Sequence, residues 1–358
     1  MASTAPTLSE PALTGPDRLL AEAAQVARHA DSRLSAVIGD LFLPDFVRPT
    51  DLQRASMANM MSALVAEIEA GLRRDVAERL GDAAPPVLTV DRIPIVRPIF
   101  DRACVLKDRE LVALLLARSE EHRICRALLR IAHVQPEAVS SAPLGIDPLL
   151  EQALLVAERR RTGTHGEPQL LSLDLPAELL HRLLWWAAAA LRDYLERMSS
   201  LDPGARDEAL TDAVQAWLAR HDEGRALEGA AMRAAVSGDA GDERLIDAFR
   251  GGRFSLFVAM LAVRARLDFA PTFMLAADPG ISALAVLLRA VDVSTQTAAP
   301  ILLQMAAVNH LSDAKLEERV TDFLDLDIEA AQRAIQPWRL GAAFRGAIAD
   351  IGRERRQR

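Results

Sequence analysis

The clearest hydrophobic pattern lies in the stretch from Leu245 to His310. Apolar residues recur there at i, i+3, i+4 and i+7, the spacing of one face of an α-helix. The pattern predicts a succession of short, alanine-rich helices, which is typical of bundles and α-solenoids. The apolar faces of the three helices expected here are Phe254, Phe257, Val258 and Leu261; Ile281, Leu284, Ala285 and Leu288; and Ala298, Ile301, Leu302 and Met305.

The same spacing predicts helices along most of the chain. One begins near Pro16 and another near Thr50, which has capping-box spacing to Gln53. The best strand candidate, Val87–Val90, is too short to build a sheet. We therefore expect an all-α, α-solenoid-like or irregular multi-helix array of short antiparallel helices. Further helices are expected over Leu72–Leu80, Ile93–Arg102, Arg109–Ala117, Glu120–Ala132, Ala177–Met198, Pro203–His221 and roughly Asp313–Ile351 with a break at Pro337.

Three Asp-Pro pairs mark expected helix starts: Asp147-Pro148, Asp202-Pro203 and Asp278-Pro279. The aspartate carboxylate accepts the free N–H groups of a first helical turn. Proline at the next position loses no hydrogen bond and has its φ angle already set. The repeated pair favours one helix following another through tight turns.

Charge and composition limit the classes of function. Aromatic residues make up only 4 % of the chain, which favours helices packed through Leu, Ala, Val and Ile. The formal net charge of −8 argues against a protein that coats nucleic acid. The longest apolar run, Leu183–Leu191, is too short to span a bilayer. Two cysteines and no signal-peptide pattern lead us to expect a cytoplasmic protein without a membrane span.

The charged, glycine-containing segment ERRRTGTHGEPQ, residues 158–169, predicts a domain boundary. We expect a disordered tail over residues 1–15, an N-terminal helical domain over 16–158 and a C-terminal helical domain over 176–351. Residues 159–175 would form the linker, and residues 352–358 a basic tail. The arginines of the linker loop lack the spacing of a phosphate-binding loop.

Basic residues exceed acidic ones by four between Arg92 and Arg130. Two interpretations remain open. The arginines line a pocket for a phosphate-bearing or acidic ligand, since guanidinium groups bind phosphate bidentately. Alternatively, they form the solvated face of stacked helices. The candidate ligand or partner patch comprises Arg97, Arg102, Arg109, Arg118, Arg123, Arg126 and Arg130.

Other chemistry-bearing residues form no recognisable constellation. His122 and Cys125 lie one helical turn apart, with Cys104 upstream, but a zinc site needs about four S or N ligands. The seven histidines have no ligand spacing, and no nucleophile motif is present. Trp185-Trp186 suits either a partner groove or a core helix. We therefore expect no catalytic residues, no metal and no cofactor.

Two stretches carry a resemblance to a known family. The first is Leu72–Ala132, with LRRDVAERLGDAAPPVL and VRPIFDRACVLKDRELVALL. The second is FRGGRFSLFVAMLAVRARLDFAPTFMLAADPGISALAVLLRAV. Both resemble the bacterial domain-of-unknown-function family 2336, over residues 50 to 345. The resemblance implies an α-solenoid-like fold of degenerate HEAT-like repeats, with the HEAT-like part over residues 50–132. It implies no activity and no site residues.

The sequence thus favours a non-catalytic helical-repeat protein that acts as a protein–protein interaction adaptor or regulator. Its partner would be another protein or a second copy of the chain, and not nucleic acid. The alternative is a sensor for a small ligand, such as a nucleotide second messenger, held by the arginine-rich patch.

Overall fold

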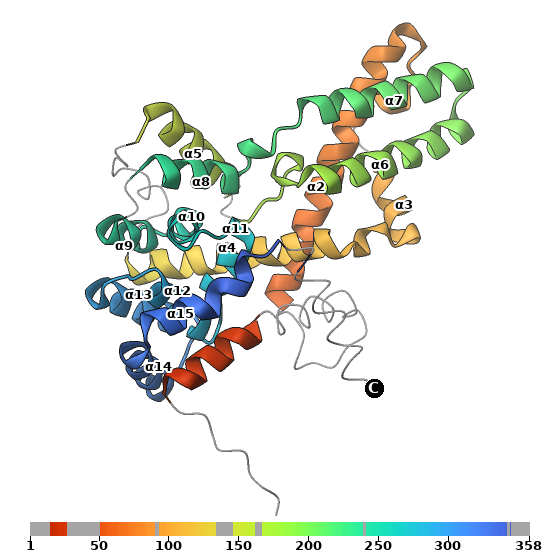
Figure 1. Cartoon of the computed structure of the whole chain (residues 1–358). Helices are drawn as coiled ribbons and strands as arrows, with labels where there is room; N and C mark the ends of the chain where they lie inside the picture. The colour runs from red at the N-terminus through yellow and green to blue at the C-terminus, as the bar shows by residue number, and fades with distance from the viewer. Residues whose placement is uncertain are drawn as a thin grey trace, which may run out of the picture. The chain divides into compact units, whose positions relative to one another are not determined.

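The computed structural model describes residues 15–26, 51–89, 93–133, 146–161, 167–238, 241–341 and 344. Within these ranges every regular element is a helix, and none is a strand (Figure 1). The prediction of an all-α array is therefore confirmed. The helices of the described chain include none that is long and apolar enough to cross a membrane.

Contacts among Cα atoms group the chain into two units. Unit 1 comprises Met1–His29, Ala240–Phe249 and Met260–Arg358, and unit 2 comprises Ala30–Asp239 and Arg250–Ala259. Of the predicted linker, residues 159–175, the described parts belong to unit 2: residues 159–161 end α5, and the part after residue 166 bonds to a neighbouring helix. Ser172, for example, donates from its amide and hydroxyl to the Glu67 carboxylate, at 3.0 and 2.7 Å.

Unit 2 is built on long helices. Its core is a continuous cluster of Leu, Val, Ile, Met and Ala side chains contributed mainly by α2, α4, α6 and α7. The helices are α2 (Asp51–Leu80), α3 (Val96–Ala103), α4 (Arg109–Ile131), α5 (Pro148–Arg161), α6 (Ala177–Met198), α7 (Pro203–Arg220), α8 (Leu227–Ser237) and the first half of α10 (Phe254–Ala265).

Unit 1 is built on short helices around α12, most of whose residues are buried. Residues 16–26 are also helical and belong to this unit. Its other helices are α9 (Asp242–Arg250), α11 (Phe269–Ala276), α12 (Ser282–Ala290), α13 (Thr295–Val308), α14 (Asp313–Asp325) and α15 (Ile328–Ile335), followed by a 3₁₀ turn over Gln336–Arg339. The three helices expected between Leu245 and His310 are present, while α9 and α11 were not anticipated.

Several helix boundaries differ from prediction. The separate helices expected at Thr50 and Leu72 are one helix, α2. The predicted break before Leu72 is wrong, and the helix continues through Gly71. A Cβ at Gly71 would lie 2.3 Å from the ring of Trp217 on α7, so glycine permits this close packing. Likewise, Arg109–Ala117 and Glu120–Ala132 are one helix, α4, in which Ser119 is buried. The strand candidate begins in a 3₁₀ turn, Pro86–Leu88, and Val90 lies outside the described residues.

Two of the three Asp-Pro pairs start helices as predicted. Asp147 accepts the amide of Leu149 at 2.7 Å, and Asp202 accepts that of Ala205 at 2.8 Å. The third pair differs, because α12 begins at Ser282 and not at Pro279. The Asp278 carboxylate still accepts an amide of the first helical turn, that of Ala283, at 2.9 Å. The expected tails, residues 1–15 and 352–358, lie outside the described residues except for Gly15, which lies in a turn.

Candidate functional site

The seven arginines of the predicted patch do not converge. Six lie on the surfaces of α3 and α4, where Arg102, Arg109, Arg126 and Arg130 are exposed. Two others bind carboxylates of their own helix: Arg97 to Asp101 at 2.9 Å, and Arg123 to Glu120 at 2.6 Å. The seventh, Arg118, points into the interior, where it is 3 % exposed. The patch is thus divided between a solvated surface and a buried network.

Arg118 belongs to a closed ring of four alternating charges inside unit 2. It donates to Glu121 at 3.2 Å and to Glu228 at 3.3 Å. Arg161 contacts the same two carboxylates from the other side. The ring joins α4, α5 and α8, because Arg161 ends α5 and Glu228 lies in the first turn of α8. Within the ring, the two positive charges balance the two negative ones.

The ring extends to α10 through Ser255, whose hydroxyl donates to Glu121. Burial raises the pKa of Glu121 to about 7, while the charge of Arg118 and this hydrogen bond act in the opposite direction. A buried ion pair is costly to break, because the remaining partner is left uncompensated. The ring therefore fixes α5 and α8 to α4 at one end of the α5–α8 pair.

Two further groups lie in this region. Arg253 binds Glu158 of α5 at 2.9 Å, and burial raises the pKa of that carboxyl. Burial and the charge of Glu121 raise the pKa of the Cys125 thiol. A raised thiol pKa disfavours the nucleophilic thiolate. The arrangement suits a structural cluster of charges better than a catalytic one.

Helices α5 and α8 lie side by side in unit 2 and run antiparallel (Figure 1). Arg161 at the C-terminal end of α5 meets Glu228 near the start of α8. At the opposite end, Leu150 of α5 and Val236 of α8 line one depression. Between these ends the pair buries small and apolar side chains: Leu154, Ala157, Leu227, Ala230, Ala231, Ala234 and Ala235.

The outer face of this pair is also apolar. On α5, Leu149, Ala153 and Val156 follow each other at i, i+4 and i+7, and on α8, Met232 and Val236 are one turn apart. Leu149 is 75 % exposed, Val156 47 % and Val236 67 %. The depression, of about 250 Å³, is lined by Leu150, Met232, Arg233, Val236 and Ser237. We call these residues, with Leu149, Ala153 and Val156, the α5–α8 outer face.

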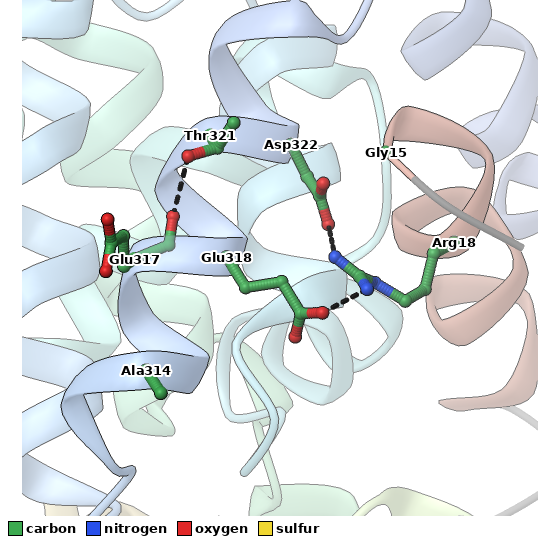
Figure 2. A pocket seen from close by; sticks show the side chains of 7 residues that line it. All are labelled: Gly15, Arg18, Ala314, Glu317, Glu318, Thr321 and Asp322. Carbon is green, nitrogen blue, oxygen red and sulfur yellow. Dashed lines mark hydrogen bonds and ion pairs between the residues drawn. The ribbon is translucent and has the colours of Figure 1, made fainter.

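A second depression, of about 400 Å³, lies in unit 1 beside residues 16–26 and α14. Figure 2 shows Arg18 reaching from the N-terminal helix to Glu318 and Asp322 of α14. The Arg18–Asp322 distance is 2.6 Å, and Glu22 of the same helix binds Arg319 at 2.7 Å. Because opposite charges already pair across it, this depression reads as the seam along which the N-terminal helix packs.

Comparison with known families gives one match. Residues 153–336, more than half of the chain, match the family described as "Uncharacterised protein conserved in bacteria (DUF2336)". The chain belongs to this family. Neither the curated proteins nor the solved structures contain a significant match to it.

The match confirms the second stretch on which the resemblance rested, while the first, Leu72–Ala132, lies outside the matched residues. In this DUF2336 protein the family region includes most of α5 and all of α8. The outer face thus belongs largely to the family region.

Sequence reasoning missed this face. The signal was present, since α5 carries a second apolar stripe beside its buried residues Leu154 and Ala157. Both tryptophans of α6, Trp185 and Trp186, are half-buried against the core of unit 2. Among the described residues, no cluster of His, Cys, Asp or Glu is arranged to hold a metal ion.

Proposed function

We propose that this DUF2336 protein is a non-catalytic interaction protein that binds another protein through the α5–α8 outer face. The observation that carries the proposal is the exposure of Leu149 and Val156 on α5 and of Val236 on the neighbouring helix α8. Val236 also lines a depression, together with Leu150 and Met232. Single exposed apolar residues are ordinary, whereas several gathered around a concavity are typical of interaction sites. The cytoplasm is the compartment that we propose for this binding.

The buried charge ring also supports the proposal, because it holds α5 and α8 in a fixed relative position. An interface needs a rigid platform, because ordering a loose surface on binding costs free energy. Arg161 and Glu228 fasten the two helices to each other and, through Arg118 and Glu121, to α4. The apolar side chains are thereby presented on helices whose relative position is fixed.

The arginine-patch sensor is less well supported. A nucleotide pocket needs several guanidinium groups directed to one place. Arg118 binds Glu121 and Glu228, and neither of the two depressions described above is lined by an arginine of the patch. We therefore propose protein binding alone and not nucleotide sensing.

Affinity capture from the bacterium that encodes the chain tests the proposal. The tagged protein, the double variant Leu149→Ser/Val236→Ser and the control Leu303→Ser would be captured in parallel and compared by quantitative mass spectrometry. Leu303 is 56 % exposed on α13, outside the outer face. We expect a partner that is retained by the control and lost by the double variant. A partner retained equally by all three proteins would contradict the proposal.

A further inference from the structure

The N-terminal helix packs on α14 of unit 1 through a pattern of charges. Arg18 binds Asp322 of α14 at 2.6 Å and also contacts Glu318, and Figure 2 shows its guanidinium between these two carboxylates. Glu22, one turn further along the N-terminal helix, binds Arg319 of α14 at 2.7 Å. Since Arg319 also lies 3.7 Å from Asp322, charges of alternating sign connect the two helices.

The buried side of α14 matches this helix. It comprises three residues, Arg319, Asp322 and Phe323, of which two are charged. A helix that packs only on an apolar core buries apolar side chains. Here both buried charges pair with the N-terminal helix, because Asp322 accepts from Arg18 and Arg319 donates to Glu22. This side of α14 is therefore a surface that receives a helix with a particular spacing of charges.

Helix α12 completes the surface. The hydroxyl of Ser282, the first residue of α12, donates to Glu22. Beside its two paired charges the N-terminal helix buries only Leu19 and Ala23, which are 0 % and 5 % exposed. The pattern that the α12–α14 surface accepts is thus Arg-Leu-x-x-Glu-Ala, with one residue of each neighbouring pair charged and the other apolar.

These contacts select the helix more than they hold it. Release of the helix returns Arg319 and Asp322 to water, so hydration offsets much of the lost ion pairing. The apolar surface at stake is mainly that of one leucine and one alanine. Net charge does not drive the contact, since Asp17 on the helix and Glu317 beside α14's depression add carboxylates to both sides. The position of each charge therefore decides which helix fits.

We infer from this arrangement that the α12–α14 surface also binds the N-terminal helix of a second copy of the chain, by exchange with the chain's own helix. Exchange of an identical element replaces every contact by the same contact made between copies. Residues 27–50 separate the helix from α2, which belongs to unit 2. A connection of that length can span up to about 80 Å, so chain length does not confine the helix to its own copy.

Protein concentration sets the balance between the two arrangements. A tethered helix has an effective concentration of up to about millimolar at its own site. The closed monomer therefore prevails in dilute solution, and exchange requires locally concentrated protein. The surface lies on unit 1 and is independent of the α5–α8 outer face of unit 2.

A labelled peptide tests the docking surface. Fluorescein-labelled peptide of residues 15–26 would be titrated with the full-length Leu19→Asp chain, whose own helix is disabled, and with the wild-type chain. We expect the variant to bind the peptide at least about tenfold more tightly, because the wild-type helix occupies the surface. Circular dichroism establishes that the variant is folded, and the milder Arg18→Ala/Leu19→Ala chain replaces it if it is not. No binding to a folded variant would overturn the inference.

A charge exchange shows whether the peptide makes the contacts described here. Adding Arg319→Glu to the Leu19→Asp chain should weaken peptide binding about tenfold, and a peptide with Glu22→Arg should restore most of it. Adding Leu303→Ser, on the exposed side of α13, should leave binding unchanged. An unaffected affinity in the Arg319→Glu chain, or a loss that the altered peptide does not restore, would contradict the assigned surface.

Complementation tests the second copy as the occupant. The Leu19→Asp chain keeps the surface without a competent helix, and the Arg319→Glu chain keeps the helix without its surface. The tagged Leu19→Asp chain would be mixed with either the purified Arg319→Glu chain or a chain that carries both changes. We expect the Arg319→Glu chain to be retained at least about fivefold more than the double variant. Equal retention would show that the helix does not bind between copies.

Hydrogen exchange of the wild-type chain tests the release of the helix without any substitution. Amides of residues 16–26 should exchange at least about tenfold faster than those of α12, because the helix leaves its surface while α12 stays folded. Equal protection of the two helices would mean that the N-terminal helix is released only when unit 1 unfolds. That result would rule out exchange of the helix from the folded protein, whatever the variants show.

Discussion

Two antiparallel helix pairs of unit 2 differ in where they place their charged and apolar side chains. The pair α6–α7 is apolar inside, where Leu183, Leu191 and Val214 join the core, and charged outside. Its outer side chains form exposed ion pairs, such as Arg192 with Glu196 at 2.9 Å and Arg197 with Asp193 at 2.6 Å. This is the ordinary pattern of an amphipathic helix at a protein surface.

The pair α5–α8 reverses part of this pattern. It buries charges, in the ring of Arg118, Glu121, Arg161 and Glu228, and it exposes apolar side chains such as Leu149 and Val236. Most of the surface of α6–α7 is explained by hydration, because its ion pairs are readily solvated; Met198, at the C-terminal end of α6, is the exception, with 66 % of it exposed. The surface of α5–α8 is explained if a partner covers it. Under the proposed function, this difference reflects a packing role for α6–α7 and a binding role for α5–α8.

The largest effect that we expect comes from breaking the ring. At pH 8, where Glu121 is ionised, Arg118→Met leaves the buried Glu121 and the partly buried Glu228 with one guanidinium, that of Arg161. The free energy of unfolding should fall by roughly 3–5 kcal/mol. The matched change on α6, Arg192→Met, removes exposed ion pairs and should cost less than about 1 kcal/mol. Urea denaturation of both variants measures the two losses of unfolding free energy. Equal losses would contradict the predicted difference between the buried ring and the exposed ion pairs.

The pH dependence of stability tests the burial of Glu121. Because burial raises its pKa from 4.5 to about 7, the folded protein holds this proton more tightly than the unfolded chain. The free energy of unfolding should therefore decrease between pH 4.5 and 7, relative to Glu121→Gln, by on the order of 3 kcal/mol. Denaturation of both proteins across this range gives the difference. A difference that is constant with pH would show that Glu121 titrates normally.

A third prediction concerns the apolar interior beneath α7. A Cβ at Gly71 would overlap the ring of Trp217, so Gly71→Ala should destabilise the protein by about 1–3 kcal/mol. In a Trp217→Leu background the overlap is gone, and alanine should stabilise the α2 helix by up to about 1 kcal/mol. Thermal unfolding of the four proteins forms a double-mutant cycle. Additive effects would mean that the Trp217 side chain is not the reason why position 71 requires glycine.

The smallest effect is expected at the outer face. Leu149→Ser and Val236→Ser should each change the free energy of unfolding by no more than about 0.5 kcal/mol, since these side chains are exposed. The control Leu154→Ser lies on the core side of α5 and should cost more than about 2 kcal/mol. Losses as large as the control at Leu149 or Val236 would place these residues in the protein interior.

Local patterns in the sequence predicted most of the helices. The bounds of α6 match the prediction, and two Asp-Pro pairs cap helices as their chemistry requires. The errors at Gly71 and Ser119 have a common feature: each residue lies inside a helix that the local pattern did not show to be continuous. Trp217, distant in the sequence, packs against Gly71, and Ser119 is buried, and neither fact leaves a local pattern.

The ring and the outer face were beyond sequence reasoning for different reasons. Arg118 is one of many arginines, and its partner Glu228 lies 110 residues further along the chain. Arg161 and Ser255, which donate to Glu121, lie 40 and 134 residues from it. On α5 both apolar stripes are visible in the sequence, but spacing cannot tell which stripe packs inward. Only the structure shows that Leu154 is buried and Val156 is exposed.

Site-specific photo-crosslinking tests the central claim most directly. A benzophenone amino acid would replace Leu149 or Val236 on the outer face, and Asp193 or Glu196 on α6, in growing cells of the bacterium that encodes the chain. All four residues are exposed, so the probe is tolerated equally. We predict a discrete crosslinked partner at Leu149 and Val236 and none at the α6 positions. No crosslink at the outer face, or the same products from both faces, would contradict the account.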